Sequence, residues 1–225
     1  MLVSKFEYLP LKRQTIEGKR HYCLPDGSKV PSVTTILDKT KPQERKQALH
    51  NWKKRVGHAK AQEITTEAAG RGTRMHTFLE AYIKTGALKD PGKNPYSKQS
   101  HQMASKIISE GLNNLVEAWG LEAPLYYSGL YAGTTDCVGI WDGEPAIIDF
   151  KQTNRPKRTA WIEDYFIQLC AYKEAHNHMF NTSIKKGVIL MCSKDFEFQH
   201  WVIDGSDIRK YTNMWWDKVE QFFDV

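Results

Sequence analysis

The dipeptide Asp142-Gly143 lies between two runs rich in β-branched and aromatic residues, 134–141 and 145–153. An Asp-Gly pair in this setting is the strongest short-range signal for a β-hairpin with a two-residue loop. Because side chains alternate along each strand, the position of the turn fixes which residues face each other. The sequence therefore predicts both a hairpin and its register.

Two aspartates, Asp136 and Asp149, are equally distant from this turn, so the register places them directly opposite each other. The pair falls at a non-hydrogen-bonded position, where the two Cα atoms are about 4.5 Å apart. Lys151 emerges on the same face as Asp149, whereas Ile148 and Phe150 face the other side. Opposed carboxylates destabilise a sheet unless a positive charge lies between them.

Paired carboxylates beside an ammonium group suit a hard divalent cation, Mg²⁺ or Mn²⁺, which prefers oxygen ligands and activates water. The alternative is a salt-bridged polar patch on an exposed sheet face. Apolar neighbours of the two aspartates favour partial burial, and burying an uncompensated pair of acids is costly. We therefore predict a metal site at this hairpin.

The 225 residues suit one domain, and the order of expected elements indicates a mixed α/β fold. Glycines at 70 and 72 are expected to bend or break one long helix, and Glu122 to begin the strand before the hairpin. The expected strands are 21–24, 29–37, 122–131, 134–141, 145–153, 187–193 and 197–203, and the expected helices are 43–56, 58–84, 98–119, 161–180 and 208–223.

The formal net charge of +6 is concentrated between Lys39 and Lys60, where eight basic residues accompany one acid. A second basic group, from Lys151 to Arg158, follows the predicted metal site. For one basic helix alone, a solvated surface is the better interpretation. Two basic groups on either side of an acidic site instead favour a polyanion such as nucleic acid.

The composition also excludes several classes of protein. The longest apolar stretch, 188–192, is too short to span a bilayer, and because charged residues occur at positions 5 and 7 we expect no secretory signal. Four cysteines without a CxxC pair do not support a disulfide scaffold or a zinc finger. We expect a cytoplasmic protein with no membrane partner, in the bacterial host cytoplasm if phage-encoded. The sequence leaves the oligomeric state open, a monomer included.

The acid at position 136, followed by Asp149-Phe150-Lys151, resembles the minimal motif of the PD-(D/E)XK nucleases. The segment from Gly70 to His76 resembles the Gly-x-x-x-His helix of the RecB-like branch of that superfamily. Within this branch, residues 30–37 and 52–55 resemble the N-terminal signature of the mitochondrial genome maintenance exonuclease group and related phage exonucleases.

Two further features resemble the same branch. Gln168 and Tyr172 match its Gln-x-x-x-Tyr helix, and a spacing of four residues places both side chains on one helix face. Glu122 matches the additional acid of the first family motif. Thr135 before the first aspartate and Gln152 after the lysine depart from the common pattern of the branch.

The resemblance implies roles for these residues. Lys151 would orient a water molecule and neutralise phosphate charge. Glu80 would contact His76 from outside the metal coordination sphere. Gln168 and Tyr172 would contact the scissile phosphate or hold Lys151 in position. The implied metal ligands are the side chains of His76, Glu122, Asp136 and Asp149 and the carbonyl of Phe150. The candidates for phosphate contacts are Arg71, Lys46, Lys53, Lys54, Arg155, Lys157 and Arg158. For most of these, a surface charge or a core polar pair is the alternative interpretation.

The implied fold is a PD-(D/E)XK nuclease core, a mixed β-sheet flanked by helices, with an N-terminal hairpin and helical extension. We expect residues 1–225 to form one nuclease domain, with a DNA-engaging part at 1–97 and a catalytic core at 98–225. No iron–sulfur cluster is expected, because Cys170 and Cys192 do not supply its cysteines. Trp52 and Trp161 are expected in the core, with stacking on bases as the alternative.

The implied activity is a metal-dependent exonuclease that hydrolyses DNA, prefers single strands and uses a two-metal type of mechanism. Two alternatives remain. One is a structure-specific endonuclease of the same fold, and the other is a DNA-binding module without cleavage. The intact set of Asp136, Asp149 and Lys151 disfavours the binding module.

Overall fold

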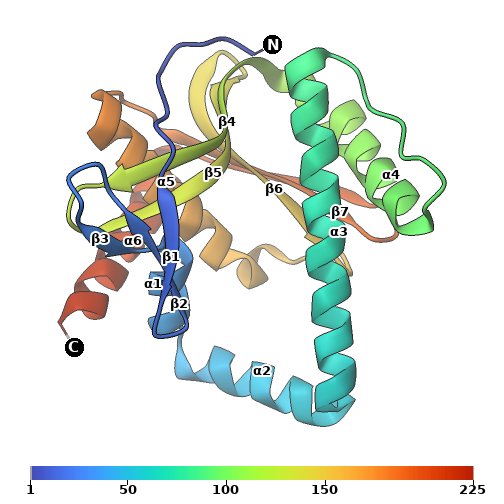
Figure 1. The fold of residues 1–225 in the computed structure, drawn as a ribbon, viewed down its shortest axis with the longest axis horizontal. Coiled ribbons are helices and arrows are strands. Elements are labelled where there is room, and N and C mark those ends of the chain that lie inside the picture. The colour runs from blue at the N-terminus through green and yellow to red at the C-terminus, as the bar shows by residue number, and fades with distance from the viewer. Residues whose placement is uncertain (1, 225) are drawn as a thin grey trace.

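A five-stranded mixed sheet forms the centre of the computed structural model, which describes residues 2–224 (Figure 1). Its strands are arranged in chain order, and all neighbours are antiparallel except β6 and β7. A helix joins this parallel pair, which is the usual connection between parallel strands. The strands are β4 (Leu115–Tyr127), β5 (Tyr131–Trp141), β6 (Glu144–Thr153), β7 (Lys186–Ser193) and β8 (Phe198–Ile203).

The β5–β6 hairpin has the register that the sequence predicts. Asp142 and Gly143 adopt φ angles of 46° and 78°, and a type I′ turn needs both of its central residues in this left-handed region. Five consecutive pairs run outward from the turn and end at Cys137 opposite Ile148. The turn thus fixes the pairing as expected.

Helices cover both faces of the sheet. Ile148 and Phe150 lie in the core on the face covered by helices 58–85 and 95–110. Ile147 and Ile189 lie in the core on the face covered by helices 163–180 and 205–223. Among residues 2–224, no helix combines the length and apolar character needed to cross a membrane. The helices are α3 (His58–Thr85) and α4 (Pro95–Glu110) on one face, and α5 (Glu163–Phe180) and α6 (Gly205–Phe223) on the other.

A small antiparallel sheet of β1 (Lys12–Ile16), β2 (Lys19–Cys23) and β3 (Lys29–Pro31) precedes this core. The expected strand 29–37 is wrong beyond β3, because Val33–Lys39 forms helix α1. The hydroxyl of Ser32 accepts a hydrogen bond from the backbone N–H of Thr35 at 3.0 Å. This N-cap outweighs the strand preference of the β-branched residues that follow.

Helix α2 (Gln43–Val56) and the N-terminal half of α3 project from the body as an arch, and we use this name below (Figure 1). Helix α2 matches its predicted bounds but buries none of its residues. Helix α3 runs through Gly70 and Gly72 without a break, contrary to expectation. A Cβ at Gly72 would lie 3.2 Å from the side chain of Gln152, so this glycine allows α3 to approach β6 closely.

The expected helix 98–119 is wrong at its C-terminal end. Helix α4 ends at Glu110, where the N–H of Gly111 bonds to the carbonyl of Ile107 at 2.8 Å. A single helical turn then leads into β4, whose first residues pair with β5. This pairing overrides the local helical pattern, so Glu122 lies in the middle of β4 rather than at its start.

Candidate active site

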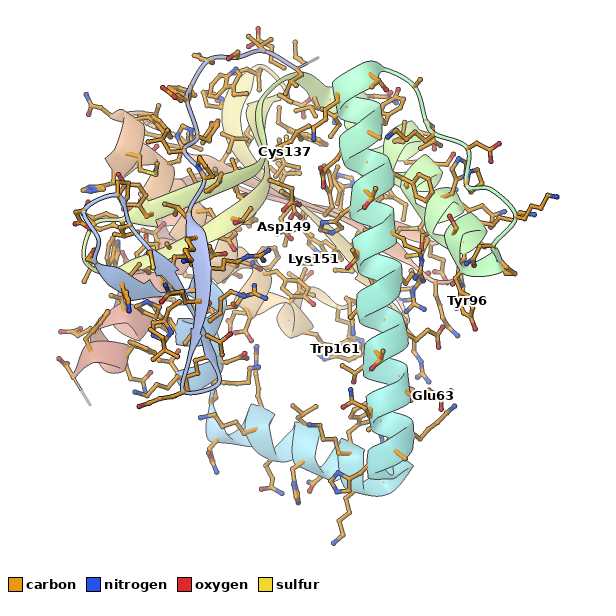
Figure 2. The ribbon with its side chains drawn as sticks, in the orientation of Figure 1. Glu63, Tyr96, Cys137, Asp149, Lys151 and Trp161 are labelled. Atoms are coloured by element: carbon orange, nitrogen blue, oxygen red, sulfur yellow. The ribbon has the colours of Figure 1, made fainter. Side chains whose placement is uncertain are left out.

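Three acidic side chains from three neighbouring strands meet at one point of the sheet. The β4–β5 register places Glu122 beside Asp136. The β5–β6 register, one step beyond its last pair, places Asp149 on the other side of Asp136. Figure 2 shows Asp149 and Lys151 between the N-terminal sheet and α3. The facing arrangement of the two aspartates therefore agrees with the prediction from the turn.

The regular ladder between β5 and β6 ends at this point, and the side chain of Asp136 takes over its hydrogen bonding. The Oδ2 atom of Asp136 accepts a hydrogen bond from the backbone N–H of Phe150 at 2.7 Å. A carboxylate oxygen thus replaces the backbone carbonyl that would otherwise pair with this N–H. The bond holds the first aspartate against the strand that carries the second.

His76 reaches the acids from α3. Its Nε2 lies 2.9 Å from the carbonyl oxygen of Phe150, while its Nδ1 lies 3.5 Å from Asp136 Oδ1 and 3.8 Å from Glu122 Oε1. If Nε2–H donates to this carbonyl, Nδ1 faces two carboxylates. One ligand atom each from the histidine, the glutamate and the aspartate lie within 4.8 Å of one another.

Glu122 has an unusual backbone for a residue inside a strand. Its φ angle of 47° lies in the left-handed region, which costs a non-glycine residue about 1–3 kcal/mol. Such strain persists only where the surrounding structure enforces it, and it is concentrated at functional sites. Here the strained residue carries the carboxylate that faces His76.

Lys151 pairs with Asp149, with 2.5 Å between Nζ and Oδ2. Both side chains are largely buried, with exposed fractions of 19% and 4%. The Lys151 ammonium is thus a partner of Asp149 Oδ2, and because a carboxylate oxygen has two lone pairs, this atom can accept a further ligand. The Lys151 ammonium also lies 5.1 Å from the centre of the Tyr165 ring, a cation–π contact.

Electrostatics at the site favour an added positive charge. Burial and the charge of Asp149 raise the pKa of Asp136 to about 7. Burial alone would lower the pKa of His76, but pairing with Glu122 and the charge of Asp136 raise it to about 9. Burial would likewise lower the pKa of Lys151, but the two aspartates raise it above its usual range. The acids thus hold both basic groups protonated at neutral pH.

The residues present fit a divalent cation. Carboxylate oxygens, an imidazole nitrogen and a backbone carbonyl are donors that Mg²⁺ and Mn²⁺ accept. The raised pKa of Asp136 indicates a carboxylate with too little positive charge around it. His76 would lose its proton on binding a metal, because an imidazole ligates only in its neutral form.

The chain is similar in sequence to curated exonucleases, although no protein-family model matches it. Mitochondrial genome maintenance exonuclease 1 of Xenopus tropicalis is 29% identical over 225 residues, which cover 95% of this chain and 62% of that protein. The Mus musculus protein of the same name is 28% identical over 206 residues, covering 86% of this chain and 59% of that protein. The chain therefore spans about three fifths of the length of these curated relatives.

A solved structure described as an exonuclease from Eubacterium rectale shares the fold, with a TM-score of 0.50 and 14% identity. The match covers 69% of this chain and 64% of that one. The sequence similarity and the shared fold together support a nuclease of the PD-(D/E)XK type. The RecB-like resemblance of the motifs and the expected mixed sheet flanked by helices agree with this assignment.

Tyr172 of α5 lines a cavity together with Glu122, and Gln168 contacts Tyr172. The Nε2 of Gln168 donates to the Tyr172 hydroxyl at 3.0 Å, which leaves the hydroxyl proton free for another acceptor. Burial raises the pKa of Tyr172, so the hydroxyl keeps its proton. Gly133 of β5 makes room for the ring, since a Cβ there would lie 2.6 Å from Tyr172 Cε1.

Arg71 is buried, with 1% of its surface exposed, and links α3 to β6. Its guanidinium donates to Gln152 at 3.0 Å, to Glu67 at 3.2 Å and to Asn154. Sequence reasoning assigned no role to Gln152 or Asn154. The available signal was strand alternation, which turns Gln152 toward α3 when Lys151 faces the acids. A phosphate contact by Arg71 stays a prediction.

Glu80 does not support His76 in the way that the resemblance implied. Within residues 2–224, its partner is Lys84, whose Nζ lies 3.3 Å from Glu80 Oε2. Glutamate and lysine four residues apart on a helix form this pair readily. The groups that face the histidine are the carboxylates of Glu122 and Asp136 instead.

The remaining phosphate-contact candidates lie at or near the arch. A cavity of about 840 Å³ opens between the arch and the loop after β6, and Arg155 and Lys157 line it together with Arg55 and Lys194. The other candidates, Lys46, Lys53, Lys54 and Arg158, are exposed, the first three on α2. Each of the two basic groups of the sequence thus contributes to the lining of one cavity, the first through Arg55 and the second through Arg155 and Lys157.

Two tryptophans also line this cavity. Trp161 is 59% exposed, so its expected place in the core is wrong (Figure 2). The guanidinium of Arg158 lies 5.3 Å from the centre of its ring. Trp52 of α2 faces the cavity and is half-buried. Helix α5 begins only at Glu163, and Trp161 is the last residue of the short helical turn before it. Trp161 therefore does not pack in the core with the side chains of α5.

Proposed function

We propose that the chain is a metal-dependent DNA exonuclease that hydrolyses phosphodiester bonds and prefers single strands. The observation that carries this proposal is the meeting of Glu122, Asp136 and Asp149 with His76 and Lys151 at one point of the sheet. The names of the similar proteins support exonuclease activity on DNA as the starting hypothesis.

A bound divalent cation supplies a water of lowered pKa and positive charge for the phosphoryl transition state. Around it, each residue of the chain has its own task. Asp136 and Asp149 would hold the cation, and Lys151, which keeps its proton, would orient the attacking water and offset charge on the phosphate. The hydroxyl of Tyr172 has a proton free to donate to a phosphate oxygen.

The preference for single strands rests on the cavity below the arch. Its basic side chains suit a phosphate backbone, and its two tryptophans suit stacking on unpaired bases. Stacking of a base on an aromatic side chain contributes about 1–3 kcal/mol, and paired bases cannot offer their faces in this way. An exposed Trp161 beside Arg158 therefore supports a single strand as the substrate.

The test uses one labelled sequence as a linear and as a circular single strand, each incubated with protein and Mg²⁺. We expect stepwise shortening of the linear strand, no cleavage of the circle, and no activity without metal. Asp149→Asn should be inactive, whereas the control Asp217→Asn, an exposed acid on α6, should match the wild type.

Two outcomes would overturn the proposal in different directions. Cleavage of the circle would indicate an endonuclease of the same fold. Equal inactivity of the wild type and Asp149→Asn on every strand, with binding retained, would indicate a DNA-binding module.

A further inference from the structure

A second and smaller cavity, of about 140 Å³, adjoins the metal site. Glu122 and Tyr172 line it, and both also belong to the site described above. Its other walls come from the N-terminal sheet, from the start of α1 and from β5. We call it the arginine pocket, lined by Arg13, Arg20, Thr34, Glu122, Thr134 and Tyr172 among others.

The arginine pocket presents two guanidinium groups, and the carboxylate in its lining, that of Glu122, also faces His76. Arg13 lies on β1 and Arg20 on the adjacent β2, and both are exposed. Within residues 2–224, neither forms an ion pair. Hydroxyl groups of Thr34, Thr134 and Tyr172 also line the pocket. Guanidinium forks with hydroxyl donors are the combination that proteins use for phosphate groups.

The size and charge of the pocket indicate which phosphate it would take. Pockets for whole small molecules measure about 300–1,000 Å³, so 140 Å³ suits a single group rather than a nucleotide. A phosphomonoester carries a charge of about −1.5 to −2 at pH 7, more than a backbone diester carries. Two arginines match that charge. Glu122 faces His76, so its carboxylate belongs to the metal donors rather than opposing both arginines.

We propose that the arginine pocket binds the terminal phosphate of a DNA strand and thereby selects the strand end that enters the metal site. This inference rests on the proposed function, because only a nuclease that starts at ends needs such a pocket. Since Glu122 lines both places, a phosphate in the pocket lies next to the position of the scissile phosphate.

The test measures binding rather than cleavage, by fluorescence anisotropy in EDTA. The probes are one labelled single strand with a 5′-phosphate, the same strand with a 3′-phosphate, and the same strand with hydroxyls at both ends. The variant is the double substitution Arg13→Gln/Arg20→Gln. The control is Lys12→Gln/Lys29→Gln, which removes the same charge from the same small sheet outside the pocket.

We expect the wild type to bind either the 5′-phosphorylated or the 3′-phosphorylated strand about tenfold more tightly than the hydroxyl-ended strand, because hydrogen bonds to charged groups are strong. The arginine variant should lose this preference and keep its affinity for the hydroxyl-ended strand. The lysine control should retain the preference.

Equal affinity of the wild type for all three strands would overturn the inference. So would a loss in the arginine variant that is the same for all three strands, which would indicate contact with an internal phosphodiester. Cleavage is measured separately with Mg²⁺. A preference for a phosphorylated end without any cleavage would contradict the proposed function and leave the pocket assignment standing.

Discussion

Asp136 lowers the stability of the metal-free protein at neutral and alkaline pH. Its side chain is 13% exposed, and burial together with Asp149 raises its pKa from 3.8 to about 7. The folded state therefore holds this proton more tightly than the unfolded state. Stability is greatest below the unfolded pKa and is lost as the pH rises toward 7. Replacing Asp136 by asparagine removes this loss.

The size of the effect follows from the pKa. A shift of about three units corresponds to about 4 kcal/mol, at 1.36 kcal/mol for each unit. Asp136→Asn keeps an oxygen that can accept the bond from Phe150 N–H, but it gives up attraction to His76. We therefore expect the metal-free variant to be more stable than the wild type at pH 8 by up to about 4 kcal/mol. Near pH 4 the two should be equal.

Urea unfolding in EDTA at pH 4.5 and pH 8 measures this difference, with Asp217→Asn as the control acid on the surface. Adding Mg²⁺ should then stabilise the wild type and not Asp136→Asn, because a ligand stabilises only the state that binds it. A variant that is less stable than the wild type at pH 8 in EDTA would refute this reasoning. A difference that does not change with pH would refute it equally.

Three further results are expected. Gly139→Ala should destabilise the protein by about 3 kcal/mol or prevent folding, since its Cβ would lie 2.0 Å from the carbonyl oxygen of Glu117; an unchanged urea midpoint would contradict this. Burial lowers the pKa of His176 to about 4, so the unfolded state binds a proton at this group more readily than the folded state. The free energy of unfolding of the wild type should therefore fall by about 2.5 kcal/mol from pH 7 to pH 4.5 through this group, and that of His176→Gln should fall by less. Lys53→Gln/Lys54→Gln should reduce the salt dependence of strand binding. The slope of log affinity against log salt concentration should be smaller by about 0.7 for each phosphate that the protein no longer neutralises. An unchanged slope would show that neither lysine contacts the strand.

The hairpin was predictable because its determinants are local. Asp142-Gly143 fixes the turn, the turn fixes the register, and the register brings Asp136 beside Asp149. No contact between distant segments is needed for this part of the site. Lys151 follows from strand alternation alone, and its pairing with Asp149 is the result.

Other elements depend on partners that lie far away in the sequence. Leu115–Trp119 has a helical pattern but pairs with β5, and a strand forms because the partner is available. Helix α1 forms where one serine caps a run of β-branched residues. His76 could be assigned only from the resemblance, because its approach to Asp136 requires α3 to lie across β6. The arginine pocket had no signal in the sequence, since its walls come from residues as far apart as Arg13 and Tyr172.

Crystals of the protein grown with Mn²⁺ allow the most direct measurement, an anomalous difference map collected near the manganese absorption edge. We expect a strong peak bonded to Asp136 and Asp149, with His76 within the coordination sphere. Asp136→Asn crystals under the same conditions should lose that peak. A wild-type map without a peak between these carboxylates at saturating Mn²⁺, or with Mn²⁺ bound only elsewhere, would contradict a metal-dependent nuclease site at this place in the fold.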